Sequence, residues 1–225
     1  MPGRWRVGST RMQGVVVDAC WRPAVDTHCG DFHDVIDLHD GRVAVVVGDV
    51  AGSGLDASIH ADRLTAVVRS RLREDVDLAP VLAELDVVTH ATSNELLVTM
   101  IVAIIDPIAR TTQLLNAGHL PIVASGLSGS RFVNGVANPP IGVSSERTIV
   151  ELVLERDAVL YAMTDGLVER RWSPLDDGLQ VFVDACLDGS VATASAVEVA
   201  ARVTEQLGQP SDDATVLSVR LLDAV

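Results

Sequence analysis

The sequence lacks lysine altogether and is poor in aromatic residues and cysteine. Its 17 basic residues are all arginines, which excludes a phosphate-binding loop of the G-x-x-x-x-G-K-[ST] type. The three cysteines, Cys20, Cys29 and Cys186, include no C-x-x-C pair, so neither a disulfide framework nor a cysteine-rich zinc site is expected. Aromatic residues make up 3% of the chain and hydrophobic residues 48%, so its core should consist mainly of Val, Leu, Ile and Ala.

Positive charge and long apolar runs are also scarce. The formal net charge of −14 at pH 7 excludes the basic face that a nucleic-acid-binding protein needs. The sequence contains no run of about 20 apolar residues, the length that a membrane-spanning helix needs. It also has no apolar segment after a basic start, as a secretion signal would have. We therefore expect a cytoplasmic protein, and its 225 residues suffice for one domain with its own core.

Hairpin-linked strands and paired helices are predicted along the chain. Asp40–Gly41 is a hairpin signal between strands expected over 31–38 and 42–47. Apolar residues at helical spacing predict two consecutive helices, over 55–73 and 78–89. Further strands are expected over 15–20, 96–105, 111–116, 121–124, 131–136, 148–154, 158–163 and 214–222, and further helices over 179–187 and 192–207. This order favours one α+β domain with mostly antiparallel sheets over residues 12–225, after a loosely ordered tail over residues 1–11.

Four separate segments carry aspartates where a predicted strand begins or ends. The residues are Asp31, Asp49, Asp165, Asp212 and Asp213. One such aspartate is ordinary turn chemistry, but several carboxylates brought together repel one another unless a cation is bound. Mg²⁺ and Mn²⁺ take oxygen ligands, and two such ions held by a bridging carboxylate can activate a water for attack on phosphorus. The glycines around Asp49 would leave room for a metal ion and for a main-chain carbonyl that faces it.

Two other patterns compete with this interpretation. Gly52, Gly54 and Ala57 form a loose G-x-G-x-x-A pattern after a strand, as in nucleotide-dependent oxidoreductases. That pattern needs a second parallel strand about 20 residues later, whereas this segment leads into another predicted helix, which disfavours the assignment. His33 in DFHD and His119 in NAGHLP are candidates either for a contact with substrate or metal or for a purely structural role.

Six motifs together resemble a known enzyme family. The segments CGDFHDVIDLHDGRVAVVVGDVAGSGLDAS, ELLVTMIVAIIDP, LLNAGHLP, NPPIGV, LYAMTDGLVE and PSDDATVLSVR follow one another as in metal-dependent protein phosphatases of type 2C, the PPM family. The chain is most similar to the bacterial sporulation-stage-II-E-like branch, from about residue 15 to 222. The resemblance implies a four-layer α-β-β-α sandwich with two central, mostly antiparallel sheets.

The resemblance also implies a centre of two Mn²⁺ or Mg²⁺ ions. Asp49 would bridge both ions, and Asp31 and Asp165 would be the other catalytic residues. Asp212 is favoured over its neighbour as a direct ligand because the family's final motif begins with the ligand. The full set of implied ligands is Asp31, Asp49, the carbonyl of Val50, Asp165, Asp212 and Asp213.

The implied activity is that of a serine/threonine protein phosphatase. Similar proteins remove phosphate from phosphoserine or phosphothreonine on anti-sigma antagonist proteins in bacterial partner switching, and a homodimer is one expected state. Three positions depart from the family motifs: His33 replaces a common aromatic residue, Ser53 a basic or histidine side chain, and Asp56 a proline. These departures leave open an alternative, a catalytically weak phosphatase-like scaffold that binds or senses a partner.

Overall fold

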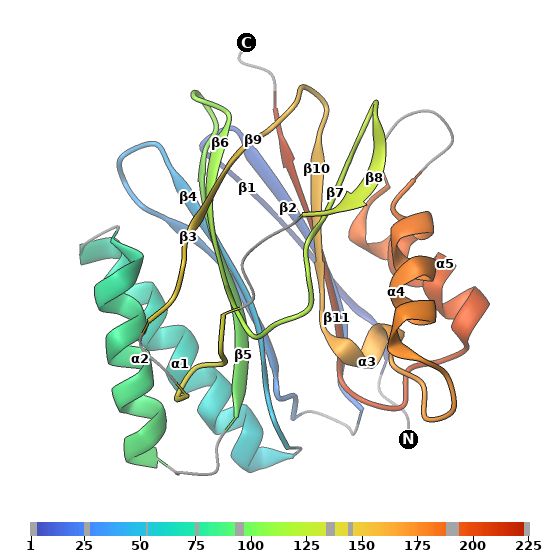
Figure 1. Cartoon of the computed structure of the whole chain (residues 1–225), viewed down its shortest axis with the longest axis horizontal. Helices are drawn as coiled ribbons and strands as arrows, with labels where there is room; N and C mark the ends of the chain where they lie inside the picture. The colour runs from blue at the N-terminus through green and yellow to red at the C-terminus, as the bar shows by residue number, and fades with distance from the viewer. Residues whose placement is uncertain are drawn as a thin grey trace. The chain divides into compact units, whose positions relative to one another are not determined.

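The structure is a computed structural model that describes residues 4–24, 28–52, 54–74, 77–92, 97–133, 138–143, 146–187 and 194–222. The chain divides into two compact units (Figure 1). The terminal unit comprises Met1–Thr27, Leu120–Asn134 and Leu154–Val225, and the central unit comprises His28–His119 and Gly135–Val153. Each unit contains one antiparallel sheet with its own helices, which confirms the α+β class. That residues 12–225 act as one domain stays a prediction.

The central unit is a five-stranded sheet covered by two helices. The strand order is β3-β4-β5-β6-β9, with every neighbouring pair antiparallel. Helices α1 and α2 pack on one face of this sheet (Figure 1). The elements are β3 (Asp31–Asp37), β4 (Val43–Val50), α1 (Leu55–Glu74), α2 (Leu78–Thr92), β5 (Val98–Asp106), β6 (Thr111–Ala117) and β9 (Val150–Val153).

Side-chain alternation explains how these strands meet the helices. Ala44, Val46 and Val50 are alternate positions of β4 and belong to the apolar core beneath α1 and α2. Phe32 on β3 fills the place left by Gly48, because a Cβ there would lie 2.3 Å from the Phe32 Cζ. The neighbouring positions of β4 therefore point to the opposite face of the sheet, and Asp49, the last residue but one of the strand, is one of them.

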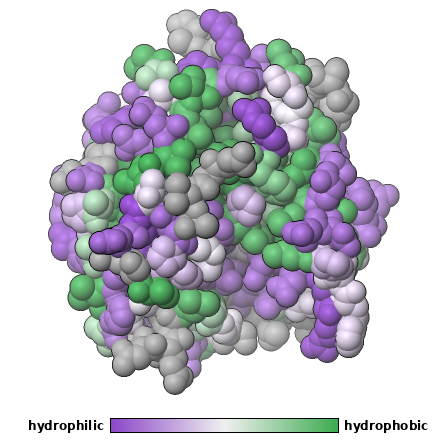
Figure 2. Space-filling view, viewed as in Figure 1, coloured by the Kyte–Doolittle hydropathy of each residue, from purple (hydrophilic) through white to green (hydrophobic). Residues whose placement is uncertain are grey.

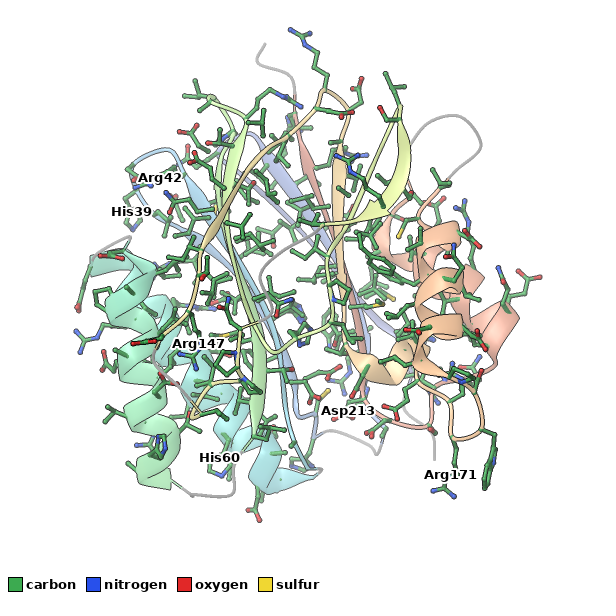
Figure 3. All side chains as sticks on the ribbon, in the orientation of Figure 1. His39, Arg42, His60, Arg147, Arg171 and Asp213 are labelled. Atoms are coloured by element: carbon green, nitrogen blue, oxygen red, sulfur yellow. The ribbon has the colours of Figure 1, made fainter. Side chains whose placement is uncertain are left out.

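A buried ion pair joins α2 to the segment before β9. Arg147, labelled in Figure 3, donates to both carboxylate oxygens of Asp86 at 2.8 and 2.9 Å. It also donates to the carbonyls of Pro139 at 3.2 Å and Pro140 at 2.7 Å, and its side chain is 0% exposed. Asp86 in turn accepts the Gly142 N–H at 2.7 Å. These hydrogen bonds satisfy the buried charges and hold the segment in place.

The terminal unit is a six-stranded sheet with three helices. Its strand order is β1-β2-β11-β10-β7-β8. Its core contains Tyr161 and Phe182, and the Tyr161 hydroxyl donates to the Ala194 carbonyl at 2.7 Å. The elements are β1 (Arg6–Met12), β2 (Val15–Arg22), β7 (Val123–Gly126), β8 (Gly129–Phe132), β10 (Val159–Met163), α3 (Asp165–Val168), α4 (Leu175–Ala185), α5 (Ala196–Leu207) and β11 (Ala214–Leu221).

The N-terminal segment differs from the sequence prediction. Residues 6–11, expected to belong to a loose tail, form β1 together with Met12, and β1 pairs with β2 from Arg6 opposite Trp21 to Met12 opposite Val15. The turn between the strands uses positive φ at Gln13 and Gly14, 48° and 81°. An edge strand has a neighbour on one side only and is partly exposed to solvent, so it needs few apolar residues. Its sequence therefore lacks the apolar pattern that would distinguish it from an unstructured tail.

Three other parts of the structure go beyond or differ from what the sequence predicts. The strand predicted over 131–136 begins earlier, at Gly129, and ends at Phe132, and residues 134–137 are outside the described residues. The short helix α3 follows β10 directly and has no periodic signal of its own. The strands predicted over 148–154 and 158–163 both form, but β9 pairs with β6 whereas β10 pairs with β7 and β11.

The surface carries apolar as well as charged side chains. Ile108, Val153 and Trp172 are 91%, 80% and 93% exposed, and the face drawn in Figure 2 mixes hydrophobic with hydrophilic residues. Single exposed apolar residues of this kind are ordinary. None of the described helices combines the length and apolar character needed to cross a membrane.

Candidate metal centre

Two predicted ligands of the central unit lie side by side. Asp31 is the first residue of β3, and the register of the β3–β4 ladder places it directly opposite Asp49. Directly opposed residues in antiparallel strands point to the same face and have Cβ atoms about 4.5–5.5 Å apart. Phe32 and Val50, their neighbours in sequence, belong to the core beneath the helices. The two carboxylates therefore share the face opposite α1 and α2.

A glycine keeps the space beside these carboxylates open. A Cβ at Gly30 would lie 2.7 Å from the Val50 carbonyl oxygen and 3.4 Å from Asp49 Oδ1. The Val50 N–H donates to the Gly30 carbonyl at 3.2 Å, which fixes the two segments against each other. Carboxylate and main-chain carbonyl oxygens are the donors that Mg²⁺ and Mn²⁺ prefer, so this group fits a divalent cation. Sequence reasoning missed Gly30, whose only signal is a small residue just before an aspartate.

The row of polar residues extends onto the next strand. Thr99 on β5 lies opposite Asp49, so Asp31, Asp49 and Thr99 share one face across three neighbouring strands. The Thr99 hydroxyl is 2.7 Å from Nδ1 of His119. Sequence reasoning named His119 but missed Thr99, which is the one polar residue in the run from Leu97 to Ile105.

The terminal unit gathers the other three predicted ligands. Just after β10, Thr164 is held to β11 by two hydrogen bonds: its N–H donates to the Thr215 carbonyl at 3.0 Å, and its Oγ1 accepts the Thr215 N–H at 2.8 Å. Asp165 at the start of α3 is thereby brought to the segment before β11, where Figure 3 labels Asp213. A Cβ at Gly166 would lie 2.0 Å from the Asp213 carbonyl oxygen, so only glycine allows this approach.

Negative charge accumulates around Asp165. Burial, and then the nearby carboxylates of Glu169 and Asp212, raise the pKa of Asp165 above its usual range. A bound cation would reverse this effect, because it stabilises the charged form of each carboxylate. A divalent ion would stabilise this half-buried carboxylate together with the exposed carboxylates that repel it.

The two adjacent aspartates before β11 have different surroundings. Asp213 is 7% exposed, and its Oδ1 accepts the Ala24 N–H at 2.7 Å. Its own N–H donates to Asp212 Oδ1 at 2.8 Å, and Asp212 is exposed. Asp213 thus has a structural hydrogen bond that ties the end of β2 to the segment before β11. The surroundings favour Asp212 as the residue with oxygens open to a metal ion.

The positions that depart from the family motifs are only partly described. His33 shares the face of Asp31, and burial lowers its pKa against the opposing effect of Asp34. Asp56 is exposed in the first turn of α1, where a negative charge interacts favourably with the helix dipole. Ser53 lies outside the described residues. Within the described ranges, no group of three or more His, Cys, Asp or Glu side chains is close enough to hold a metal.

The sequence profile of the family described as Stage II sporulation protein E (SpoIIE) matches residues 39–222. The chain belongs to this family. The matched range includes Asp49, Asp165 and Asp212, whereas Asp31 precedes it. This membership confirms the resemblance to the sporulation-stage-II-E-like branch of the type 2C metal-dependent protein phosphatases.

Several known proteins are similar to this SpoIIE-family chain. Phosphoserine phosphatase RsbP of Bacillus subtilis (strain 168) is 23% identical over 147 residues, which cover 62% of this chain and 36% of RsbP. The RsbU and RsbW domains of Rv1364c from Mycobacterium tuberculosis share 24% identity at a TM-score of 0.83, covering all of this chain and 61% of that one. RsbX, solved in complex with magnesium, shares 15% identity at a TM-score of 0.71, covering 96% of this chain and all of RsbX.

These similarities show the fold of the chain and how much of each relative's length it covers. The α+β sandwich predicted from the sequence is confirmed, since the PP2C domain of SpoIIE from Bacillus subtilis also matches over the whole chain at a TM-score of 0.76. The chain spans about a third of the length of RsbP and under two thirds of the Mycobacterium tuberculosis structure.

Proposed function

We propose that this chain is a metal-dependent serine/threonine protein phosphatase. The observation that carries the proposal is the Asp31–Asp49 pair, set beside a main-chain carbonyl that Gly30 leaves accessible. A pair of facing carboxylates with an open carbonyl is a costly arrangement without a cation. The membership of the SpoIIE family supports the same conclusion.

Each unit contributes proposed ligands of its own. In the central unit these are Asp31, Asp49 and the Val50 carbonyl, and in the terminal unit they are Asp165 and Asp212. When bound, two Mn²⁺ or Mg²⁺ ions would acidify a water and stabilise charge on the phosphoryl group. The chain's own part is to orient the carboxylates, and the glycines keep side chains away from the oxygens.

The proposed substrate is phosphoserine or phosphothreonine on an anti-sigma antagonist-type protein. Its support comes from the relatives: RsbP is named a phosphoserine phosphatase, and the Mycobacterium tuberculosis structure contains RsbU and RsbW domains. A further neighbour belongs to the bacterial stressosome. A cytoplasmic location and a homodimer stay predictions.

Hydrolysis of p-nitrophenyl phosphate and of a phosphoserine peptide, with EDTA, Mg²⁺ or Mn²⁺, tests the activity. Asp49→Asn should lower metal-dependent turnover by about 100-fold or more, because it removes a charged oxygen ligand of the ions that would stabilise the transition state. Asp106→Asn is the matched control. That aspartate ends the neighbouring strand β5. Its Oδ1 accepts the turn N–H groups of Ile108 and Ala109 at 2.9 and 2.8 Å, and asparagine keeps the acceptor oxygen.

The outcomes separate the two candidate functions. Metal-dependent turnover that survives in the control and is lost in Asp49→Asn supports the phosphatase. Undiminished turnover in Asp49→Asn would refute it. Mn²⁺ binding without hydrolysis of either substrate would instead support the scaffold that binds or senses a partner, which the replacements at His33 and Asp56 motivate.

A further inference from the structure

The main chain of His119 is held rigidly at the end of β6. The Asn116 side chain accepts the His119 N–H at 2.8 Å and donates to the His119 carbonyl at 3.0 Å. Gly118 has a φ of 70°, and a Cβ there would lie 2.7 Å from Cγ of Pro140. The turn therefore needs glycine for both its conformation and its packing. The imidazole that it carries has little freedom, since His119 is 9% exposed.

This imidazole fixes the hydroxyl of Thr99. Nδ1 of His119 and Oγ1 of Thr99 are 2.7 Å apart. A threonine hydroxyl has one hydrogen to donate and two lone pairs to accept with. If the imidazole donates its Nδ1–H to Oγ1, the hydroxyl hydrogen is left for another acceptor. The β-branched threonine has few χ1 rotamers, so this one hydrogen bond largely determines where the hydroxyl points.

The residue directly opposite Thr99 is Asp49. Opposed residues of antiparallel strands have side chains close enough to interact. On its other side, Asp49 faces Asp31. The Thr99 hydroxyl is thus a neutral hydrogen-bonding neighbour in a row whose remaining members are carboxylates.

We propose that Thr99 and His119 are positioning residues for Asp49, His119 holding the Thr99 hydroxyl so that it orients the Asp49 carboxylate toward a bound divalent cation. This inference rests on the proposed function, in which Asp49 is a metal ligand. Groups that orient a metal ligand typically change metal affinity 10–100-fold when they are removed. Neither residue touches substrate in this role.

Binding of Mn²⁺ to the full chain, measured by titration calorimetry without substrate, tests the proposal. Thr99→Val removes the hydroxyl and keeps the branched shape, and His119→Phe removes the hydrogen bond from the other side. Each should weaken Mn²⁺ binding about 10-fold or more. The double variant should bind no more weakly than the single variants, because both remove the same interaction. Thr99→Ser, which keeps a hydroxyl, should restore binding to near the parent value.

Thr112→Val is the matched control for stability. Thr112 lies on β6 of the same sheet and is 0% exposed, and its Oγ1 has no hydrogen-bond partner within the described part of the chain. It should bind Mn²⁺ like the parent. The melting temperature of every variant is measured in EDTA. If Thr99→Val loses affinity for Mn²⁺ but melts close to the control, then Thr99 orients the metal ligand and does not merely stabilise the fold.

The possible failures are distinguishable. One failure concerns the positioning role alone. If Thr99→Val binds Mn²⁺ as the parent does and Asp49→Asn does not bind it, the positioning role is overturned and the proposed function stays intact. Equal weakening in Thr99→Val and Thr112→Val, or no recovery in Thr99→Ser, would also overturn it. A parent protein that binds no Mn²⁺, or an Asp49→Asn variant that binds normally, would refute the metal centre and this inference together.

Discussion

Replacing Gly166 should have the largest effect on stability and turnover that the geometry of the terminal unit predicts. The Gly166→Ala variant adds one methyl group, 2.0 Å from the Asp213 carbonyl oxygen and 3.3 Å from the Asp212 carbonyl carbon. Ordinary contacts begin at 3.4 Å, so α3 and the segment before β11 must separate by about 1.4 Å, the shortfall from 2.0 Å. The obstacle is main chain, which cannot rotate away as a side chain can.

The size of the effect follows from this displacement. Overpacking of a close contact costs about 1–3 kcal/mol, and a main-chain obstacle places Gly166→Ala at the upper end. For a chain of this length, about 3 kcal/mol lowers the melting temperature by about 6–12 °C. The same shift moves Asp165 relative to Asp212, and a misplacement of about 1 Å in a catalytic site can cost about 100-fold in rate.

Melting temperature in EDTA and metal-dependent hydrolysis of p-nitrophenyl phosphate, assayed well below the melting temperature, measure the two effects separately. Gly126→Ala on β7 is the control, because its added Cβ meets nothing nearer than Glu155 Oε2 at 3.7 Å. It should change stability by less than about 0.5 kcal/mol. If Gly166→Ala melts and turns over like this control, then α3 does not approach Asp213 as described and the reasoning is wrong.

Three further predictions concern charge. Because the pKa of Asp165 is raised in the folded state, ionising it destabilises the metal-free protein; stability is regained as pH falls through that pKa. Asp165→Asn should thus melt higher than the parent in EDTA at about pH 7, and the difference should shrink toward about pH 4. Arg147→Met leaves the Asp86 carboxylate buried and unpaired, which should cost about 3–5 kcal/mol in urea unfolding; Arg42→Met, at an exposed hairpin pair, should cost about 1 kcal/mol or less. Saturating Mn²⁺, at about 100 times its dissociation constant, should stabilise the parent by about 2.7 kcal/mol, and differential scanning fluorimetry should show no such shift for Asp49→Asn.

Local patterns predicted most of the elements correctly. The Asp40–Gly41 turn and the apolar run after it predict the β3–β4 hairpin, because turn chemistry and strand propensity act within a few residues. Helical spacing likewise predicts α1 and α2 to within a few residues of their observed ends. The edge strand β1 was missed because its pairing partner, and not its own apolar content, makes it a strand. The separation of β9 and β10 into different sheets was equally invisible, since nothing in Glu155–Asp157 distinguishes a hairpin from a crossover.

The candidate site shows the same division. The sequence by itself determined the family, the oxygen-donor chemistry and the aspartates that could supply it, because these depend on which residue types occur in which order. Only the tertiary structure decided that Asp49 lies between Asp31 and Thr99. It also decided that the Asp213 carbonyl lies against Gly166 and that the Asp213 carboxylate accepts the Ala24 N–H. Strand register and close main-chain approach join residues far apart in the chain, and no local pattern encodes them.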